Sequence, residues 1–112
     1  MFNEGVKPAV FHILLALAER DLHGYAVMQT AREQSGGRVP LNPATFYRHL
    51  SRLIDAGLVV EVAGRPKDDD PRRGAYYRTT PAGREVLQAE RRRLAGLVAA
   101  LDALKPSRRR NT

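Results

Sequence analysis

Three side chains in one short segment present the hydrogen-bond donors that nucleic acids accept. Arg48, Ser51 and Arg52 follow one another at spacings of three and one, so on a helix they share one face. A guanidinium group donates paired hydrogen bonds to guanine or to a phosphate, and a serine hydroxyl can bond to either. The segment therefore predicts contacts with DNA. The other interpretation is a solvated helix face, where most surface charge lies.

The helix that must carry these donors is predicted over residues 43–56. Asn42 can cap its first amides, Pro43 suits the first helical position, and Gly57 is a residue type that ends helices. Apolar residues recur on one stripe, which we expect to face a core: Phe46, Leu50, Leu53 and Ile54. An apolar inner face and a basic outer face are what a DNA recognition helix requires.

Two more polar residues of this helix each have two interpretations. The Tyr47 hydroxyl either touches a phosphate or stays in water while the ring packs against the preceding helix. Thr45, near the helix start, either bonds to a phosphate or only supports the cap. The full set of DNA-binding residues predicted in this helix and its cap is Asn42, Ala44, Thr45, Tyr47, Arg48, Ser51 and Arg52.

A long loop between two strand-like runs follows the helix. Residues 58–63 are rich in valine, and residues 75–80 carry two tyrosines and two threonines, so both suit strands of a β-hairpin. The loop over residues 64–74 is polar and interrupted by Gly and Pro, as expected for the tip of a hairpin wing. Its basic residues are predicted to contact the DNA backbone or minor groove: Arg65, Lys67, Arg72 and Arg73.

Two helices are predicted ahead of the recognition helix. The first covers residues 8–20 and is apolar on more than one side, so we expect a partner to cover the side that holds Phe11 and Leu15. Residues 21–23 make a break, and the second helix covers residues 24–34. Its inward-facing side chains are predicted to be Tyr25, Val27, Met28 and Ala31.

His23, Gly24 and Tyr25 resemble a catalytic fragment in residue type only. The structural interpretation explains them better. Gly24 is expected to permit a close approach between helices, Tyr25 to fill the core, and His23 to stand at a helix start. We therefore assign no chemistry to this segment.

A last helix is predicted from Pro81, with Thr80 as its cap. Leucines recur along it every seven residues with others between, which is the pattern of a seam that pairs with another helix. We expect a homodimer formed through Phe11, Leu15, Leu87, Leu94, Leu97, Val98, Leu101 and Leu104. The expected division is a DNA-binding domain over residues 1–80, a dimerisation helix over residues 81–105, and a disordered basic tail over residues 106–112.

Composition limits the class of partner. The 112 residues carry a formal net charge of +7 and a pI near 10.5, which favours nucleic acid, an acidic protein or an anionic membrane. The absence of cysteine excludes disulfides and thiolate zinc sites, and the three histidines are too far apart in sequence to suggest a metal site. The longest apolar stretch, residues 9–18, is about half of what a bilayer requires. We expect a soluble, cytoplasmic protein without a cofactor.

The order helix, helix, turn, helix, strand, basic loop, strand is that of a winged helix-turn-helix, so the expected fold class is mainly α with a small β-hairpin. Four motifs occur in the order typical of PadR-type transcriptional regulators, which the chain resembles from Ile13 to Leu104: Leu-His-Gly-Tyr at 22–25, Pro-Ala-Thr-Phe-Tyr at 43–47, Tyr-Tyr-Arg at 76–78 and Thr-Pro-Ala-Gly-Arg at 80–84. The resemblance implies a dimeric bacterial repressor. It implies the shorter subgroup, in which the last helix of one subunit packs on the first and last helices of the other.

Two positions depart from the family pattern. The loop carries three aspartates at residues 68–70, whereas family wings are generally short and basic. Because carboxylates repel phosphate, Arg72 and Arg73 are better candidates for DNA contact than the loop tip. Thr79 stands in the second strand where an aliphatic residue is common, and we expect it to weaken the core contact of that strand slightly.

The leading hypothesis is a sequence-specific DNA-binding regulator that represses as a homodimer on a pseudo-palindromic operator, with half-sites roughly 34 Å apart. The alternative is a winged-helix interaction module whose basic surface binds an acidic protein, which only the three aspartates favour. An enzyme is not expected, because no nucleophile, paired carboxylate or metal cluster is placed for chemistry. The resemblance also implies a small-molecule effector, whose pocket the sequence does not locate.

Overall fold

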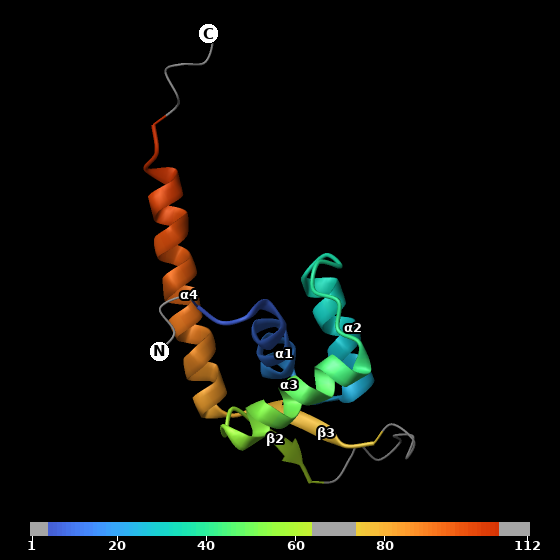
Figure 1. The fold of residues 1–112 in the computed structure, drawn as a ribbon. Coiled ribbons are helices and arrows are strands. Elements are labelled where there is room, and N and C mark those ends of the chain that lie inside the picture. Colours follow the sequence, from blue (N-terminus) through green and yellow to red (C-terminus); the bar gives the residue numbers. More distant parts are fainter. Residues whose placement is uncertain (1–4, 64–73, 106–112) are drawn as a thin grey trace.

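The computed structural model describes residues 5–63 and 74–105. Within these ranges the chain forms four helices and a three-stranded antiparallel sheet (Figure 1). In chain order the elements are α1 (Pro8–Glu19), β1 (Leu22–His23), α2 (Gly24–Gln34), α3 (Pro43–Asp55), β2 (Val59–Val62), β3 (Tyr76–Thr79) and α4 (Pro81–Asp102). The predicted fold class is confirmed, and the helices start at the predicted residues.

Three helices begin at side chains that cap their first free amides. The Asn42 side chain accepts a hydrogen bond of 2.8 Å from the backbone N–H three residues on, at the start of α3. The Thr80 hydroxyl accepts the equivalent bond of 3.1 Å in α4, and the His23 ring accepts one of 3.4 Å in α2. α3 ends two residues before Gly57, whose φ of +78° is one that glycine adopts without strain. The local start and stop signals of α3 are therefore confirmed.

The sheet has strand order β1–β3–β2 and is antiparallel throughout. β2 and β3 form the predicted hairpin, with Val59 opposite Thr79. β1 adds to the other edge of β3, with Leu22 opposite Tyr77. This strand occupies the position where the sequence predicts a break between helices. Two residues are too few to show an alternating pattern, so only the pairing with β3 reveals the strand.

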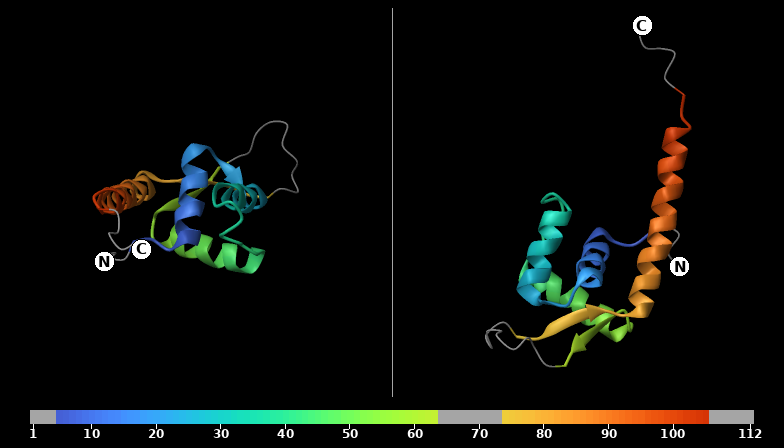
Figure 2. Two further views of the ribbon diagram at one scale, coloured as in Figure 1. Left: turned by 90° about the horizontal axis from the view of Figure 1, so that it is seen from above. Right: turned by 180° about the vertical axis from the view of Figure 1, so that it is seen from behind.

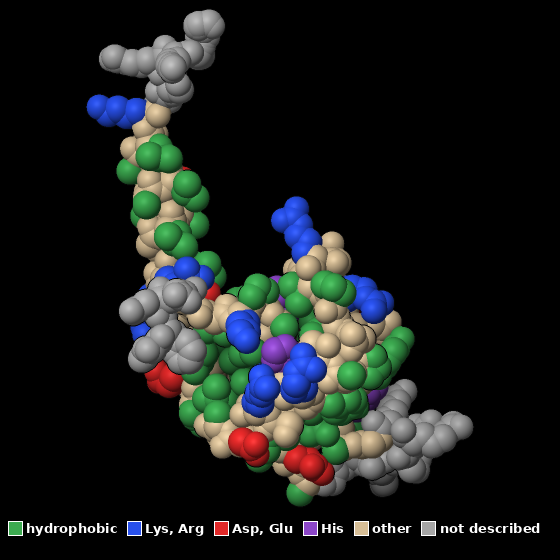
Figure 3. Space-filling view, in the orientation of Figure 1, with side chains coloured by type: hydrophobic (Ala, Val, Ile, Leu, Met, Phe, Trp, Pro, Cys, Tyr) green, Lys and Arg blue, Asp and Glu red, His purple; other side chains and the backbone are tan. Residues whose placement is uncertain are grey.

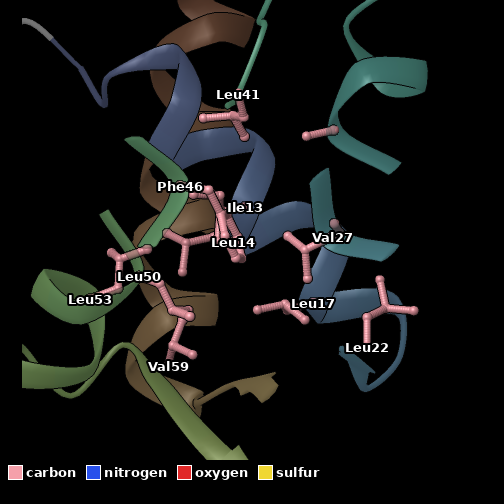
Figure 4. Close-up of a cluster of buried hydrophobic side chains, with 12 residues drawn as sticks. Ile13, Leu14, Leu17, Leu22, Val27, Leu41, Phe46, Leu50, Leu53 and Val59 are labelled. Atoms are coloured by element: carbon pink, nitrogen blue, oxygen red, sulfur yellow. The ribbon is translucent and has the colours of Figure 1, made fainter. Parts of the chain in front are cut away.

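An apolar core lies between α1, α2, α3 and β2 (Figure 4). Ile13 and Leu14 of α1 are fully buried at its centre, with Phe46 of α3 beside them. Burial of such side chains stabilises the fold by about 1.5–3 kcal/mol each. The core positions α1 behind α3 and so fixes which face of α3 is turned outward. The other buried members are Ala16, Leu17, Leu22, Val27, Ala31, Leu41, Leu50, Leu53 and Val59.

Two residues predicted to face the core are exposed instead. Tyr25 is 65 % exposed, so the expectation that it fills the core is wrong. α2 turns Val27 inward, and Tyr25, two residues earlier, falls on the other side of the helix. Ile54 is 38 % exposed because it lies at the margin of the buried stripe, one residue beyond Leu53.

Thr79 joins β3 to α1. Its side chain is buried, and its hydroxyl donates a hydrogen bond of 2.8 Å to the backbone carbonyl of Leu14. The expectation that Thr79 weakens the core contact of its strand is therefore corrected. A hydroxyl with a buried partner costs little to bury, and it sets the register of β3 against α1.

α4 stands at one side of the molecule, and its second half extends beyond the other elements (Figures 1 and 2). It contacts α1 and β3. Near its start, a side chain at Gly83 would overlap the backbone carbonyl of Leu58, so the glycine permits a close approach there. The wing end of the hairpin points away from α4. One end of the sheet therefore contacts α4, and the other end leads into the loop between β2 and β3.

Candidate nucleic-acid interface

α3 separates an apolar inner face from a polar outer face. Phe46, Leu50 and Leu53 are buried against the core. On the opposite side Arg48 and Arg52 are exposed, so their guanidinium groups are available to a ligand. Of the residues predicted on this helix and its cap, Thr45 is half-buried and the others are exposed: Asn42, Ala44, Tyr47, Arg48, Ser51 and Arg52.

Tyr47 links α3 to the start of α2. Its ring lies edge-on to that of Phe46, with centroids 4.8 Å apart and an interplanar angle of 71°. A side chain at Gly24 would overlap the Tyr47 hydroxyl, which confirms the close approach predicted at this glycine. Tyr47 is nevertheless 48 % exposed. It therefore packs against α2 and still presents one edge to solvent.

His49 lies on the flank of α3 away from Tyr47 and is half-buried. Burial, followed by the positive charges of Arg48, Lys7 and Arg52, holds the pKa of its imidazole below the ordinary value. Figure 3 shows Lys and Arg side chains gathered around a histidine on the face that carries α3. Sequence reasoning missed Lys7, because it precedes α1 and no local pattern connects it with α3.

An ion pair fixes the base of the hairpin. Arg78 of β3 donates two hydrogen bonds, of 2.8 and 2.7 Å, to the carboxylate of Asp21, in the loop before β1. These bonds hold the pKa of Asp21 below its usual value. Tyr77 precedes Arg78 in β3. Burial raises the pKa of its hydroxyl, and the charges of Glu61 and Tyr47 add to the effect. The hairpin thus reaches α3 on one side and α1 on the other.

The wing contacts expected from the sequence cannot be placed in this geometry. The acidic loop tip at residues 68–70 and the basic tail at residues 106–112 lie outside the described residues. The same holds for the predicted wing contacts Arg65, Lys67, Arg72 and Arg73.

The residues predicted to form a dimer fall into two groups. Phe11 and Leu15 of α1 and Leu87 and Leu94 of α4 line a groove of about 490 Å³ between the two helices. Charged side chains of both helices also line it: Glu19, Arg84 and Arg91. The rest of the set lies along the projecting half of α4 and just beyond its last residue, and is 50–70 % exposed: Leu97, Val98, Leu101 and Leu104.

The described residues offer little for other chemistry. Across residues 5–63 and 74–105, no group of three or more His, Asp or Glu side chains could hold a metal ion. Nor does this part of the chain contain a helix long and apolar enough to cross a membrane. What the described surface presents over α3 is a set of cationic hydrogen-bond donors.

Two sequence relatives match about three quarters of this chain. The chain is 39 % identical over 85 residues to an uncharacterised 37.1 kDa protein in transposon TN4556 of Streptomyces fradiae, covering 76 % of this chain and 22 % of that protein. It therefore spans less than a quarter of that relative. It is also 38 % identical over 86 residues to the transcriptional regulator Rv3488 of Mycobacterium tuberculosis, covering 77 % of this chain and 75 % of the relative.

A solved structure and a family model complete the comparison. The fold matches the crystal structure of a PadR family transcription regulator from Clostridium difficile with a TM-score of 0.69, at 20 % identity, over 84 % of this chain and 94 % of that one. The model of the transcriptional regulator PadR-like family matches residues 13–89. The chain therefore belongs to the PadR-like family of transcriptional regulators, which are DNA-binding proteins and not enzymes.

Proposed function

We propose that this PadR-like regulator represses transcription as a homodimer that binds a pseudo-palindromic operator through α3. The observation that carries the proposal is the division of α3, which buries one face and presents Arg48 and Arg52 on the other. An α-helix fits the major groove of B-DNA, and arginine donors match guanine edges and phosphates. The net charge of +7 favours the same partner.

The other contacts follow from their places on α3. Ser51 lies between the two arginines in the sequence and can bond to a base or a phosphate. Asn42, Ala44 and Thr45 stand at the helix start, where the backbone comes close to DNA. Tyr47 is about half exposed, and its hydroxyl is proposed to contact a phosphate. We further propose that the wing contacts the backbone or minor groove through Arg65, Lys67, Arg72 and Arg73.

The dimer is the second part of the proposal. Three apolar side chains on the projecting half of α4, and Leu104 just beyond its end, are at least half exposed, and such a stripe is unfavourable in water. A second copy would cover this stripe with its own α4 and fill the groove beside Phe11 and Leu15. In this arrangement residues 1–80 bind DNA, and residues 81–105 set the distance between two copies of α3.

Binding to an operator implies where the protein acts and how its activity would be regulated. The protein acts in the cytoplasm, where bacterial DNA lies. A small-molecule effector would relieve repression by changing the distance between the two α3 helices, because half-site spacing is a geometric requirement of dimeric binding.

A gel shift with DNA from upstream of its own gene tests the proposal. Arg48→Ala with Arg52→Ala should weaken specific binding by roughly 100-fold or more, since each such contact is worth about 1–3 kcal/mol. Arg38→Ala with Arg92→Ala is the matched control, because both side chains are exposed and lie outside α3. Unchanged specific binding by the α3 variant would overturn the assignment of this helix.

A further inference from the structure

The basic surface of α3 continues onto the segment before α1. Lys7 is exposed and stands directly before the first residue of α1. Its charge acts on the imidazole of His49, as do those of Arg48 and Arg52. Figure 3 shows Lys and Arg side chains around a histidine on this face, with Asp and Glu side chains lower on it. The basic surface therefore draws on two segments that are distant in sequence.

The backbone at Lys7 is held by the residues before and after it. Pro8 begins α1 immediately after it. The amide of Val6 donates a hydrogen bond to the carboxylate of Glu90, a side chain of α4 that is 5 % exposed. Glu90 is held in turn by Arg93, through bonds of 3.0 and 2.6 Å. Lys7 therefore stands on an anchored segment, and its charge reaches His49 of α3.

The flank of α3 that faces Lys7 is suited to an anion. A helix in the major groove has a sugar-phosphate backbone on either side. Tyr47 stands on the flank beside α2, and His49 stands on the opposite flank, beside the start of α1. Three cations act on His49 there, and a phosphate would relieve their mutual repulsion.

We propose that Lys7 and His49 together hold one DNA phosphate beside α3, so that the segment before α1 is part of the DNA-binding surface. This inference rests on the proposed function, because it names a further contact with the same partner. It adds a residue from outside the helix-turn-helix and the wing.

The proposed phosphate site should make the affinity for DNA depend on pH. The cations around the imidazole hold its pKa low in the free protein, and a bound phosphate would offset their charge and raise it. DNA binding would then take up a proton, and the affinity would rise as the pH falls through the range between the two pKa values. One proton taken up per subunit gives at most a tenfold gain per pH unit for each subunit, or at most a hundredfold gain for the dimer. Among the described residues, the charged groups that act on His49 are Arg48 and Arg52 on α3 and Lys7 before α1.

The test is a titration of a fluorescein-labelled duplex of about 30 base pairs, long enough for two half-sites one turn apart. Lys7→Gln should lower the slope of log affinity against log salt by about 0.9 per subunit, or about 1.8 for the dimer, so the affinity loss of the dimer between 50 and 200 mM salt is about 12-fold smaller. Arg92→Gln removes the same charge at an exposed position of α4, distant from α3 in sequence, and should keep the wild-type slope.

The imidazole is tested on the same duplex at pH 6 and pH 8. His49→Gln should abolish the rise in affinity at low pH, whereas His12→Gln should keep it, since His12 lies on α1 and pairs with Gln34. Circular dichroism of each variant checks the fold.

The outcomes separate the inference from the function it rests on. The phosphate site would be overturned if Lys7→Gln kept the wild-type salt slope and His49→Gln kept the wild-type pH dependence. If the Arg48/Arg52 variant lost binding in the same experiments, the α3 assignment would remain intact. Failure of the wild-type protein to bind any duplex would overturn both.

Discussion

A side chain at Gly24 would overlap the hydroxyl oxygen of Tyr47. The added Cβ would also come within 3.3 Å of the Phe46 ring, so the start of α2 meets α3 where there is no room for a side chain. The separation of the two helices in the helix-turn-helix therefore depends on a glycine. Because Tyr47 belongs to α3, a change in the distance between the two helices would also move the exposed face of α3.

We predict that Gly24→Ala pushes Tyr47 outward and shifts α3. Overpacking of this kind costs about 1–3 kcal/mol of stability, and the shift of α3 should weaken DNA binding as well. Urea unfolding and a DNA titration measure the two effects. Tyr47→Ala removes the overlapping atoms, so Gly24→Ala should cost less in that background. An equal cost in both backgrounds would contradict the contact.

The hydroxyl of Thr79 should contribute to stability. Thr79→Val keeps the shape of the side chain but leaves the Leu14 carbonyl without this donor, and we expect a loss of about 1 kcal/mol in urea unfolding. Thr79→Ser retains the hydroxyl and loses only a methyl group. If valine proved at least as stable as threonine, the bond between β3 and α1 would carry no net stability.

Glu90 should make stability depend on pH. Hydrogen bonds from Arg93, with a smaller contribution from the Val6 amide, hold the pKa of Glu90 below its ordinary value. Its contribution is therefore complete above the unfolded-state pKa of about 4.3 and is lost as the pH falls through the lower folded-state pKa. Glu90→Gln should destabilise the protein at pH 7, and the difference from wild type should shrink at pH 3.

Urea unfolding at the two pH values measures this difference. Glu85→Gln, at an exposed position of the same helix, is the matched control and should change little at either pH. A deficit of equal size for Glu90→Gln at pH 7 and pH 3 would show that the carboxylate charge contributes nothing.

The seam of α4 should control assembly. Leu97→Asp with Leu101→Asp places two charges in the proposed interface, and we expect monomers in analytical ultracentrifugation and much weaker operator binding. Ala99→Asp puts a charge on an exposed position off the seam and should leave the dimer intact. A dimer that survives the double substitution would require a different interface.

Local signals explain why much of the fold could be predicted. Asn42 and Thr80 cap helices through atoms three residues away, and Gly57 ends α3 in its own conformation, so short stretches of sequence contain the information. The apolar period of α3 likewise separated its buried residues from Arg48 and Arg52.

Tertiary contacts explain what could not be predicted. β1 exists only through its pairing with β3, and the partner of Thr79 lies 65 residues away. Tyr25 is a large, mostly apolar residue of a type often found in cores, but the orientation of α2 turns it outward. Lys7 joins the basic surface because Val6 is held against Glu90, a relation that no spacing in the sequence indicates.

Selection of genomic fragments by the purified protein tests the central claim most directly. The account predicts retained fragments that share an inverted repeat, with half-sites about one helical turn apart, and no enrichment by the Arg48→Ala, Arg52→Ala variant. Fragments without two-fold symmetry, the same fragments enriched by the variant, or retention of an acidic protein and no DNA would contradict it.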